Sequence, residues 1–152
     1  MVENMLTKNS LFWEDVEVGQ EIPPLVFSIT MKTLMLAAAG NRDFMPYHYH
    51  REFAKSIGTR DAFVNTTFNQ ALFSRFVTDW TGAGADTRSV TLKMKDQLCV
   101  GDTAQVTGTV MRKWADGEDM RIELSLDIHN EIGLTASTTT VMALPSRRHG
   151  DV

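Results

Sequence analysis

The sequence lacks most features of a secreted, membrane or nucleic-acid-binding protein. Its single cysteine, Cys99, excludes an internal disulfide and favours a reducing, cytoplasmic location. Nowhere do about 18 apolar residues follow one another, which excludes a membrane-spanning helix. Met1 to Ser10 lack the apolar centre of a signal peptide. The formal net charge is −4, so nucleic acid, which needs clustered Lys and Arg, is not an expected partner.

What the chain does contain is enough apolar residues for one core. Of its 152 residues, 43% are hydrophobic, which suits a single globular domain. We assign this domain to residues 1–144, because the periodic patterning stops at Leu144. Residues 145–152 are predicted to form a loose C-terminal tail.

The first half of the chain reads as one strand followed by helices and loops. The strand is predicted around Leu25 to Ile29, after the turn-forming pair Pro23-Pro24. A helix is predicted over Met31 to Ala39, with Thr30 as its N-cap and Gly40 as the left-handed residue that ends it. A short helix over Glu52 to Ile57 would be closed by Gly58.

The clearest helix signal covers Thr66 to Trp80. Asn65 is a suitable N-cap, and Gly82 and Gly84 mark the exit. Apolar residues recur at helical spacing and predict a buried stripe that a sheet should cover. The stripe consists of Phe68, Leu72, Phe76 and Trp80, broadened by Ala71 and Val77, while Asn69, Gln70, Ser74, Arg75, Thr78 and Asp79 are expected on the surface.

The second half, from Thr87 to Leu144, alternates apolar and polar residues as strands do. The best alternation runs from Ile122 to Ile128. Asp116-Gly117 predicts a type I′ hairpin, and Asn130 to Gly133 a second turn. Because the helices precede the strands, the pattern favours an α+β fold with an antiparallel sheet over repeated βαβ units. One long helix against long consecutive strands suits a hotdog fold, although pattern alone also permits other α+β sandwiches.

The loop Gly40 to His48 carries the candidate chemistry. Asp43 and His48 are five residues apart, and Pro46 stiffens the span between them. A loop can direct both side chains into one cleft, which a regular helix or strand cannot do at this spacing. A carboxylate and an imidazole are suited to general acid–base catalysis near neutral pH.

This loop resembles the D-x-N-P-x-H signature of the MaoC-like, (R)-specific enoyl-CoA hydratases and dehydratases. Phe12 to Gly19, Arg75 to Gly82 and Val100 to Thr103 resemble further parts of the same family. The small MaoC-like subunits of actinobacterial steroid side-chain enoyl-CoA hydratases are more similar still. That likeness rests on three short segments: Arg42-Asp43-Phe44, Phe63-Val64-Asn65 and Val77 to Trp80.

The resemblance implies a hotdog fold and hydration of a 2-enoyl-CoA, or the reverse dehydration of a 3-hydroxyacyl-CoA. Asp43 and His48 would be the catalytic pair. Backbone N–H groups at the start of the central helix, near Asn65, Thr66 and Thr67, would bind the substrate's thioester oxygen. Coenzyme A would enter as part of the substrate, with no separate cofactor. A homodimer is the default expectation from the family, and a heteromer with a second MaoC-like chain is the main alternative.

Two residues depart from the family pattern. Met45 stands where the signature has Asn, so one polar contact in the loop is lost or replaced. Asn65-Thr66 replaces the usual His-Gly, whose Gly lets the backbone approach the thioester. Both changes shift the expected substrate away from a generic short acyl chain and towards a bulky, steroid-like one.

Other interpretations of the motif remain open. Asp43 and His48 could be a capped loop with a structural histidine, an interpretation that spacing alone would favour and the flanking similarity disfavours. With His50, they could form a two-His, one-carboxylate metal site, but Pro46 and the lack of further ligands argue against one, and we expect no metal. Arg147 and Arg148 could contact coenzyme A phosphates, although a solvated tail is the commoner role.

Two rival functions follow from the same fold. A hotdog thioesterase usually carries its acid on the central helix, where this chain has Asn69 and Gln70. A non-catalytic, acyl-CoA-binding accessory subunit would keep the motif but depend on a partner for activity.

Overall fold

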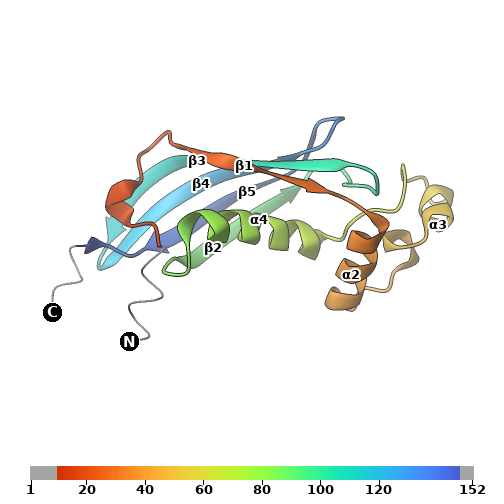
Figure 1. The fold of residues 1–152 in the computed structure, drawn as a ribbon, viewed down its shortest axis with the longest axis horizontal. Helices are drawn as coiled ribbons and strands as arrows, with labels where there is room; N and C mark the ends of the chain where they lie inside the picture. Colours follow the sequence, from red (N-terminus) through yellow and green to blue (C-terminus); the bar gives the residue numbers. More distant parts are fainter. Residues whose placement is uncertain (1–9, 148–152) are drawn as a thin grey trace.

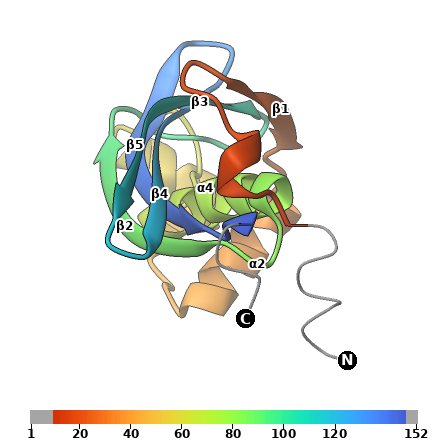
Figure 2. The same ribbon diagram turned by 90° about the vertical axis from the view of Figure 1, so that its left-hand side faces the viewer.

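A five-stranded antiparallel sheet wraps around one long helix in the computed structural model, which describes residues 10–147. The strand order is β1-β3-β4-β5-β2, and helix α4 lies along the concave face (Figures 1 and 2). This is the predicted hotdog arrangement. The strands are β1 (Glu21–Ser28), β2 (Asp86–Met94), β3 (Thr103–Asp116), β4 (Asp119–His129) and β5 (Leu134–Leu144).

The sheet follows from the alternation in the second half of the chain. Along β4, the side chains of Ile122, Leu124, Leu126 and Ile128 are fully buried. β5 spans the range predicted for it. The β3–β4 hairpin also forms, since Asp116 pairs with Asp119. Its turn is not type I′, however, because only Gly117, and not Glu118, has a positive φ, whereas type I′ needs two.

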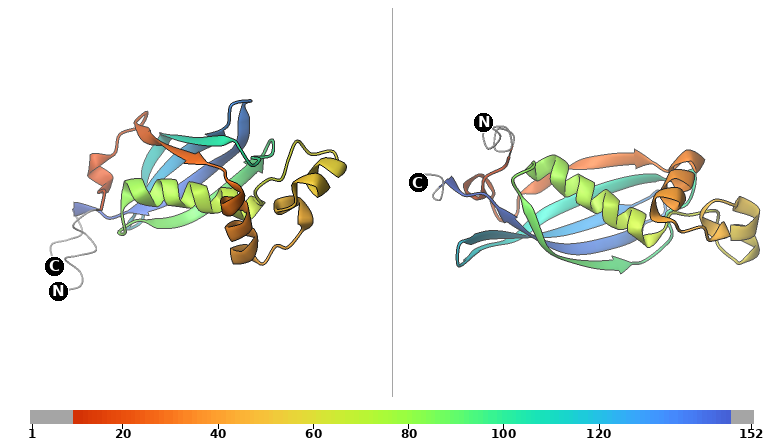
Figure 3. Two further views of the ribbon diagram at one scale, coloured as in Figure 1. Left: turned by 45° about the vertical axis from the view of Figure 1, so that its right-hand side comes forward. Right: turned by 90° about the horizontal axis from the view of Figure 1, so that it is seen from below.

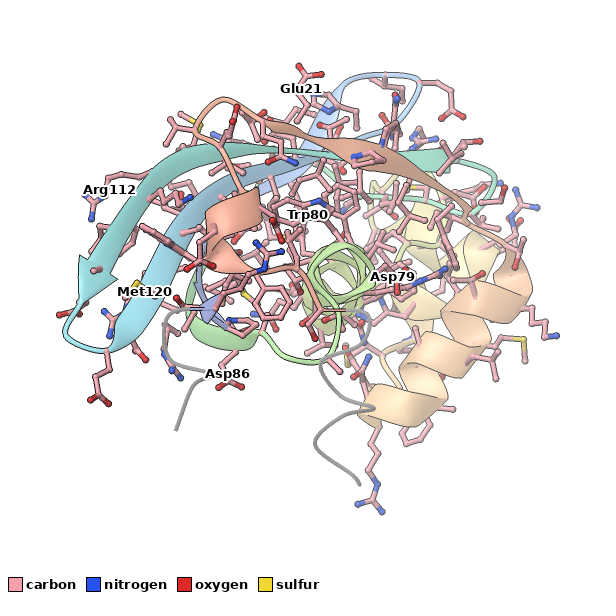
Figure 4. The ribbon with its side chains drawn as sticks, turned by 60° about the vertical axis from the view of Figure 1, so that its left-hand side comes forward. Glu21, Asp79, Trp80, Asp86, Arg112 and Met120 are labelled. Carbon is pink, nitrogen blue, oxygen red and sulfur yellow. The ribbon has the colours of Figure 1, made fainter. Side chains whose placement is uncertain are left out.

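Helix α4 (Thr66–Thr81) begins after its predicted N-cap, Asn65, and supplies the centre of the core. Figure 4 looks along this helix and shows Trp80 between it and the sheet. Two assignments of the predicted stripe are wrong. Asn69 is 1% exposed and faces the core, while Ala71 is exposed. The true buried face is formed by Asn69, Leu72, Phe73, Phe76, Val77 and Thr81.

Close packing between α4 and the sheet depends on Gly108 in β3. A Cβ atom there would lie 2.5 Å from Leu126 and 3.0 Å from Phe76. Glycine therefore allows the helix to approach the sheet at this point.

The N-terminal elements differ from expectation in two places. Pro23 and Pro24 lie inside β1, at a register shift, rather than in a turn before it. A proline is tolerated there because β1 is an edge strand and needs no ladder partner on its outer side. Helix α2 (Met31–Asn41) has the predicted cap, Thr30, but continues past Gly40; Arg42 is the left-handed residue, with φ 55°.

Three short helices complete the described chain. They are η1 (Trp13–Asp15), η2 (Pro46–His48) and α3 (Arg51–Ser56). No helix within residues 10–147 has the length and apolarity to cross a membrane. Of the predicted tail, residues 148–152 lie outside the described part of the chain, and Arg147 makes two hydrogen bonds to Asp15 at 2.8 and 2.7 Å.

Candidate active site

The candidate site lies at the end of the molecule where α4 begins. Residues 30–65, here called the site segment, contain α2, η2 and α3 and project beyond the sheet at this end (Figures 1 and 3). The rest, meaning the sheet and α4, is called the frame. The two chain termini of the described part lie at the opposite end.

The structure brings Asp43 and His48 together. The distance between Oδ2 of Asp43 and Nε2 of His48 is 3.2 Å, with the two side chains 35% and 8% exposed. Asp43 follows the left-handed turn at Arg42, while His48 ends the short helix that Pro46 begins. Proline favours the first position of a helix because its fixed φ is already helical, so the local sequence sets this arrangement.

The hydrogen bonding of His48 defines which ring nitrogen faces the site. Nδ1 lies 2.8 Å from the backbone oxygen of Phe63. A carbonyl can only accept, so Nδ1 carries a proton and donates it. In the neutral ring, Nε2 is then an acceptor that faces Asp43. The pair can therefore share one proton, or hold a water molecule that donates to both.

The rings of Tyr47 and Phe63 enclose the imidazole. They stack on each other with centroids 5.2 Å apart, and both meet the His48 ring edge-on. This packing limits the rotation of His48. Phe63 lies in a segment that resembles the family, but its role was not predicted, because it acts through its carbonyl and its ring rather than through a reactive group.

Phe63 is in turn fixed by a short stretch of strand-like pairing. Its N–H donates to the carbonyl of Tyr47, and it bridges Cys99. Val64 N–H and Val100 N–H extend this pairing on either side. Thus the backbone that orients His48 is anchored to the loop between β2 and β3.

Two buried carboxylates anchor the same region. Asp102 accepts from Arg60 at 2.8 and 2.6 Å, from Cys99 N–H and from Asn130. Burial alone would raise the pKa of Asp102, but these hydrogen bonds outweigh it and lower the pKa. Asp61 accepts from Arg51 at 2.9 and 2.6 Å, which lowers the pKa of its carboxyl to about 2.

A cavity of about 330 Å³ opens beside the pair. This volume is at the lower end of small-molecule sites. This cavity is lined by Asp43 and His48 together with the predicted residues Asn65, Thr66 and Thr67. The remaining lining residues are Tyr47, Phe63, Val64, Met94 and Gln97.

The predicted binding residues meet the site in different ways. Asn65 directs its side-chain Nδ2 at Oδ2 of Asp43, 3.4 Å away. Its Oδ1 caps α4 by accepting from Phe68 N–H. Thr66 and Thr67 are the first two residues of the helix, whose N–H groups have no partner within it.

The other residues considered from the sequence, His50, Arg147 and Met45, do not line this cavity. His50 is exposed, and its Nδ1 accepts from Phe53 N–H as the cap of α3. Within residues 10–147, no three His, Cys, Asp or Glu side chains are grouped so as to hold a metal ion. Arg147 lies near the termini, and Arg148 is outside the described residues. Met45 is exposed and gives the motif loop no polar side chain at that position.

Known proteins share both the fold and part of the sequence. The chain is 32% identical over 93 residues to the beta subunit of a 3-oxo-4,17-pregnadiene-20-carboxyl-CoA hydratase from Mycobacterium tuberculosis. The match covers 61% of this chain and 72% of that protein. No family model matches the sequence.

Solved structures agree with this relationship. A chain of the ChsH1–ChsH2 complex from Mycobacterium tuberculosis superposes with a TM-score of 0.79 and 28% identity, over 85% of this chain and 98% of that one. The R-hydratase PhaJ1 from Pseudomonas aeruginosa shares the fold, with a TM-score of 0.82 and 21% identity over 91% of this chain and 88% of that one.

The fold and the sequence similarity to a hydratase subunit define a hotdog protein of the hydratase type. The chain belongs to the MaoC-like hydratase and dehydratase family.

Proposed function

We propose that this protein hydrates a 2-enoyl-CoA thioester, or dehydrates the corresponding 3-hydroxyacyl-CoA, with Asp43 and His48 as its general acid–base pair. The single observation that carries the proposal is their 3.2 Å approach beside a cavity, with Nε2 of His48 facing Asp43. The hydratase subunit of similar sequence supports the reaction class.

Hydration adds one water molecule across the double bond. The pair removes a proton from water, whose oxygen forms a bond to Cβ. The π electrons move onto the thioester oxygen as an enolate, and the proton held by the pair then passes to Cα. The proton that His48 and Asp43 take from water is the same proton that they deliver to Cα, so the reaction balances. General acid–base assistance of this kind raises the rate by about 10²- to 10⁴-fold.

The start of α4 is suited to bind the enolate oxygen. Asn65 caps Phe68 N–H, which leaves the N–H groups of Thr66 and Thr67 as donors at the cavity wall. These donors lie at the positive end of a sixteen-residue helix. They are positioned before the reaction begins, so they need not reorganise as negative charge develops.

The partner of this chain is proposed to be a second hotdog chain. Among residues 10–147, strand β2 pairs only with β5, which leaves its other edge open, and all residues of β2 except Leu92 are exposed. Val90 and Met94 are 48% and 43% exposed there. An open strand edge presents unpaired N–H and C=O groups and is a template for another strand. The similar relative is a beta subunit, and the similar solved chain is part of a two-component complex, which favours a heteromer over a homodimer.

The acyl group is proposed to be bulky and steroid-like. The support is the hydratase subunit named for a pregnadiene-carboxyl-CoA. Short, long and steroid enoyl-CoA thioesters should therefore be assayed with and without a co-expressed second hotdog chain. We expect the highest kcat/KM for the steroid thioester in the presence of the second chain.

The catalytic assignment is tested by Asp43→Asn and His48→Gln, which preserve size while removing the acid–base groups. Hydration should fall by about 10²- to 10⁴-fold in each variant. His50→Gln is the matched control, because His50 caps α3 outside the cavity, and its activity should stay near that of the unchanged protein. Circular dichroism melting checks that every variant is folded. A folded Asp43→Asn or His48→Gln with undiminished hydration would contradict the assignment.

A further inference from the structure

The side-chain amide of Asn65 has only one orientation available to it. Its Oδ1 accepts from Phe68 N–H at 3.0 Å, from the Thr67 hydroxyl at 3.0 Å and from Asn41 Nδ2 at 3.2 Å. A backbone N–H can only donate, so turning the amide over would set donor against donor. Asn65 is also buried, at 6% exposed, where an unmatched donor is costly.

This orientation directs the amide's NH₂ group at the candidate catalytic acid. Nδ2 of Asn65 lies 3.4 Å from Oδ2 of Asp43, the oxygen that also faces Nε2 of His48. One carboxylate oxygen thus lies between a fixed donor and the imidazole.

The stretch between Asp43 and His48 does not supply the donor to the Asp43 carboxylate. Between Asp43 and His48 stand Phe44, Met45, Pro46 and Tyr47, and Met45 occupies the position where the signature has Asn. No side chain of these four contacts the Asp43 carboxylate through a hydrogen bond. The donor comes instead from the cap of α4.

The turn at Arg42 explains how two residues of one loop reach the same amide. Arg42 has φ 55° and lies between Asn41 and Asp43. It is the only residue other than glycine with positive φ in residues 10–147. The left-handed turn lets Asn41 contact the oxygen of Asn65 while Asp43 contacts its nitrogen.

From this geometry we infer that Asn65 is a positioning residue for Asp43, and that Asn41 fixes the orientation of the Asn65 amide. The inference rests on the proposed function, since it assigns the pair a role in hydration. Asn41 is exposed and does not line the cavity, so it acts only through Asn65.

Asn65→Ser separates positioning from capping. Serine is about as good an N-cap as asparagine, but its hydroxyl is too short to serve both Phe68 N–H and Asp43. We expect the melting temperature to stay nearly unchanged and kcat to fall by about 10- to 100-fold, with little change in KM, because a misplaced reactive group costs rate rather than binding. If Asn65→Ser keeps its kcat, Asn65 is only a cap and the inference is wrong.

The role of Asn41 is tested by two variants, one that removes its side-chain donor and one that replaces the donor with an acceptor. Asn41→Ala removes one donor and should lower kcat by a few fold. Asn41→Asp is nearly isosteric but places an acceptor against Oδ1 of Asn65, which favours the flipped amide and should lower kcat further. Equal effects of the two variants, or none, would overturn the role of Asn41.

A measurement without substrate tests the contact itself. Asn65→Asp retains a good cap but faces Asp43 with a second carboxylate, so it should lower the melting temperature near neutral pH. In an Asp43→Asn background this loss should largely disappear. Equal losses in both backgrounds would refute the contact. Because no turnover is needed, this result is independent of whether the protein proves to be a hydratase.

Discussion

The frame and the site segment are stabilised by different forces. In the frame, the fully buried residues are mainly apolar, such as Val106, Val110 and Leu124. In the site segment, buried polar residues are prominent, and several large apolar side chains are exposed. The buried polar residues are His48, Asp61 and Asn65, and the exposed apolar ones are Met35, Leu36, Phe44, Met45, Tyr49, Phe53 and Ile57.

This difference shows how the fold separates stability from chemistry. Apolar burial is non-directional and tolerates small shifts, whereas hydrogen bonds fix atoms at defined distances. Asp43 and His48 are placed by the second kind of force, through Asn65 and the Phe63 carbonyl. Substitutions in the two regions should therefore have different signatures.

The largest change in stability is expected in the frame. Leu124→Ala removes a fully buried side chain from β4 and should lower the free energy of unfolding by about 2–5 kcal/mol, because it leaves a cavity. The kcat of the folded fraction should not change. Urea denaturation and an assay of the native protein measure the two quantities. A lower kcat for Leu124→Ala under conditions where all of the protein is folded would contradict the separation of stability from activity.

A smaller loss of stability, with an accompanying loss of activity, is expected at Asp102. Asp102→Ala leaves Arg60, Asn130 and the buried Cys99 N–H without their acceptor, which should cost about 1–3 kcal/mol. Because Cys99 bridges Phe63, kcat should also fall.

Asp79→Ala is the control for this variant. Asp79 makes an exposed pair with Arg75 on α4, and such pairs contribute about 0–1 kcal/mol. If Asp102→Ala lowered stability but left kcat unchanged, the anchoring of Phe63 would not matter for the site.

The smallest effect is a pH dependence in the site segment. Arg51 lowers the pKa of Asp61 from 3.8 to about 2 in the folded protein. Since the folded value is the lower one, this pair stabilises the fold above about pH 4, and the contribution is lost as the pH falls towards 2. Solvent reduces it, because the Arg51 side chain is 53% exposed. Urea unfolding between pH 5 and 2 should show a steeper loss for the unchanged protein than for Asp61→Asn, and equal slopes would refute the assignment.

The same contrast explains what could be predicted from the sequence. The frame follows largely from local periodicity, which predicted β5 and the start of helix α4 correctly, whereas the family resemblance narrowed the α+β fold to the hotdog arrangement. Where the structure of the frame differs from the prediction, the cause is a tertiary contact that the local sequence does not reveal. Pro23 and Pro24 fit in β1 only because it is an edge strand, and Asn69 is buried although its residue type suggested the surface.

The site segment was less predictable because its contacts are not periodic. The loop motif selected Asp43 and His48, but their 3.2 Å separation depends on the turn at Arg42, and not on the expected left-handed Gly40. Asn41 lies inside the motif loop, yet only its distance to Asn65, 24 residues further along the chain, gives it a role.

Hydration in ¹⁸O-labelled water tests the central claim most directly. If the Asp43–His48 pair adds water across the double bond of an enoyl-CoA, the label should appear in the hydroxyl at Cβ of an intact thioester and no free coenzyme A thiol should be released. His48→Gln should slow the labelling by about 10²- to 10⁴-fold. Label found instead in a released carboxylate, together with free thiol, would show hydrolysis of the thioester and contradict the proposed reaction.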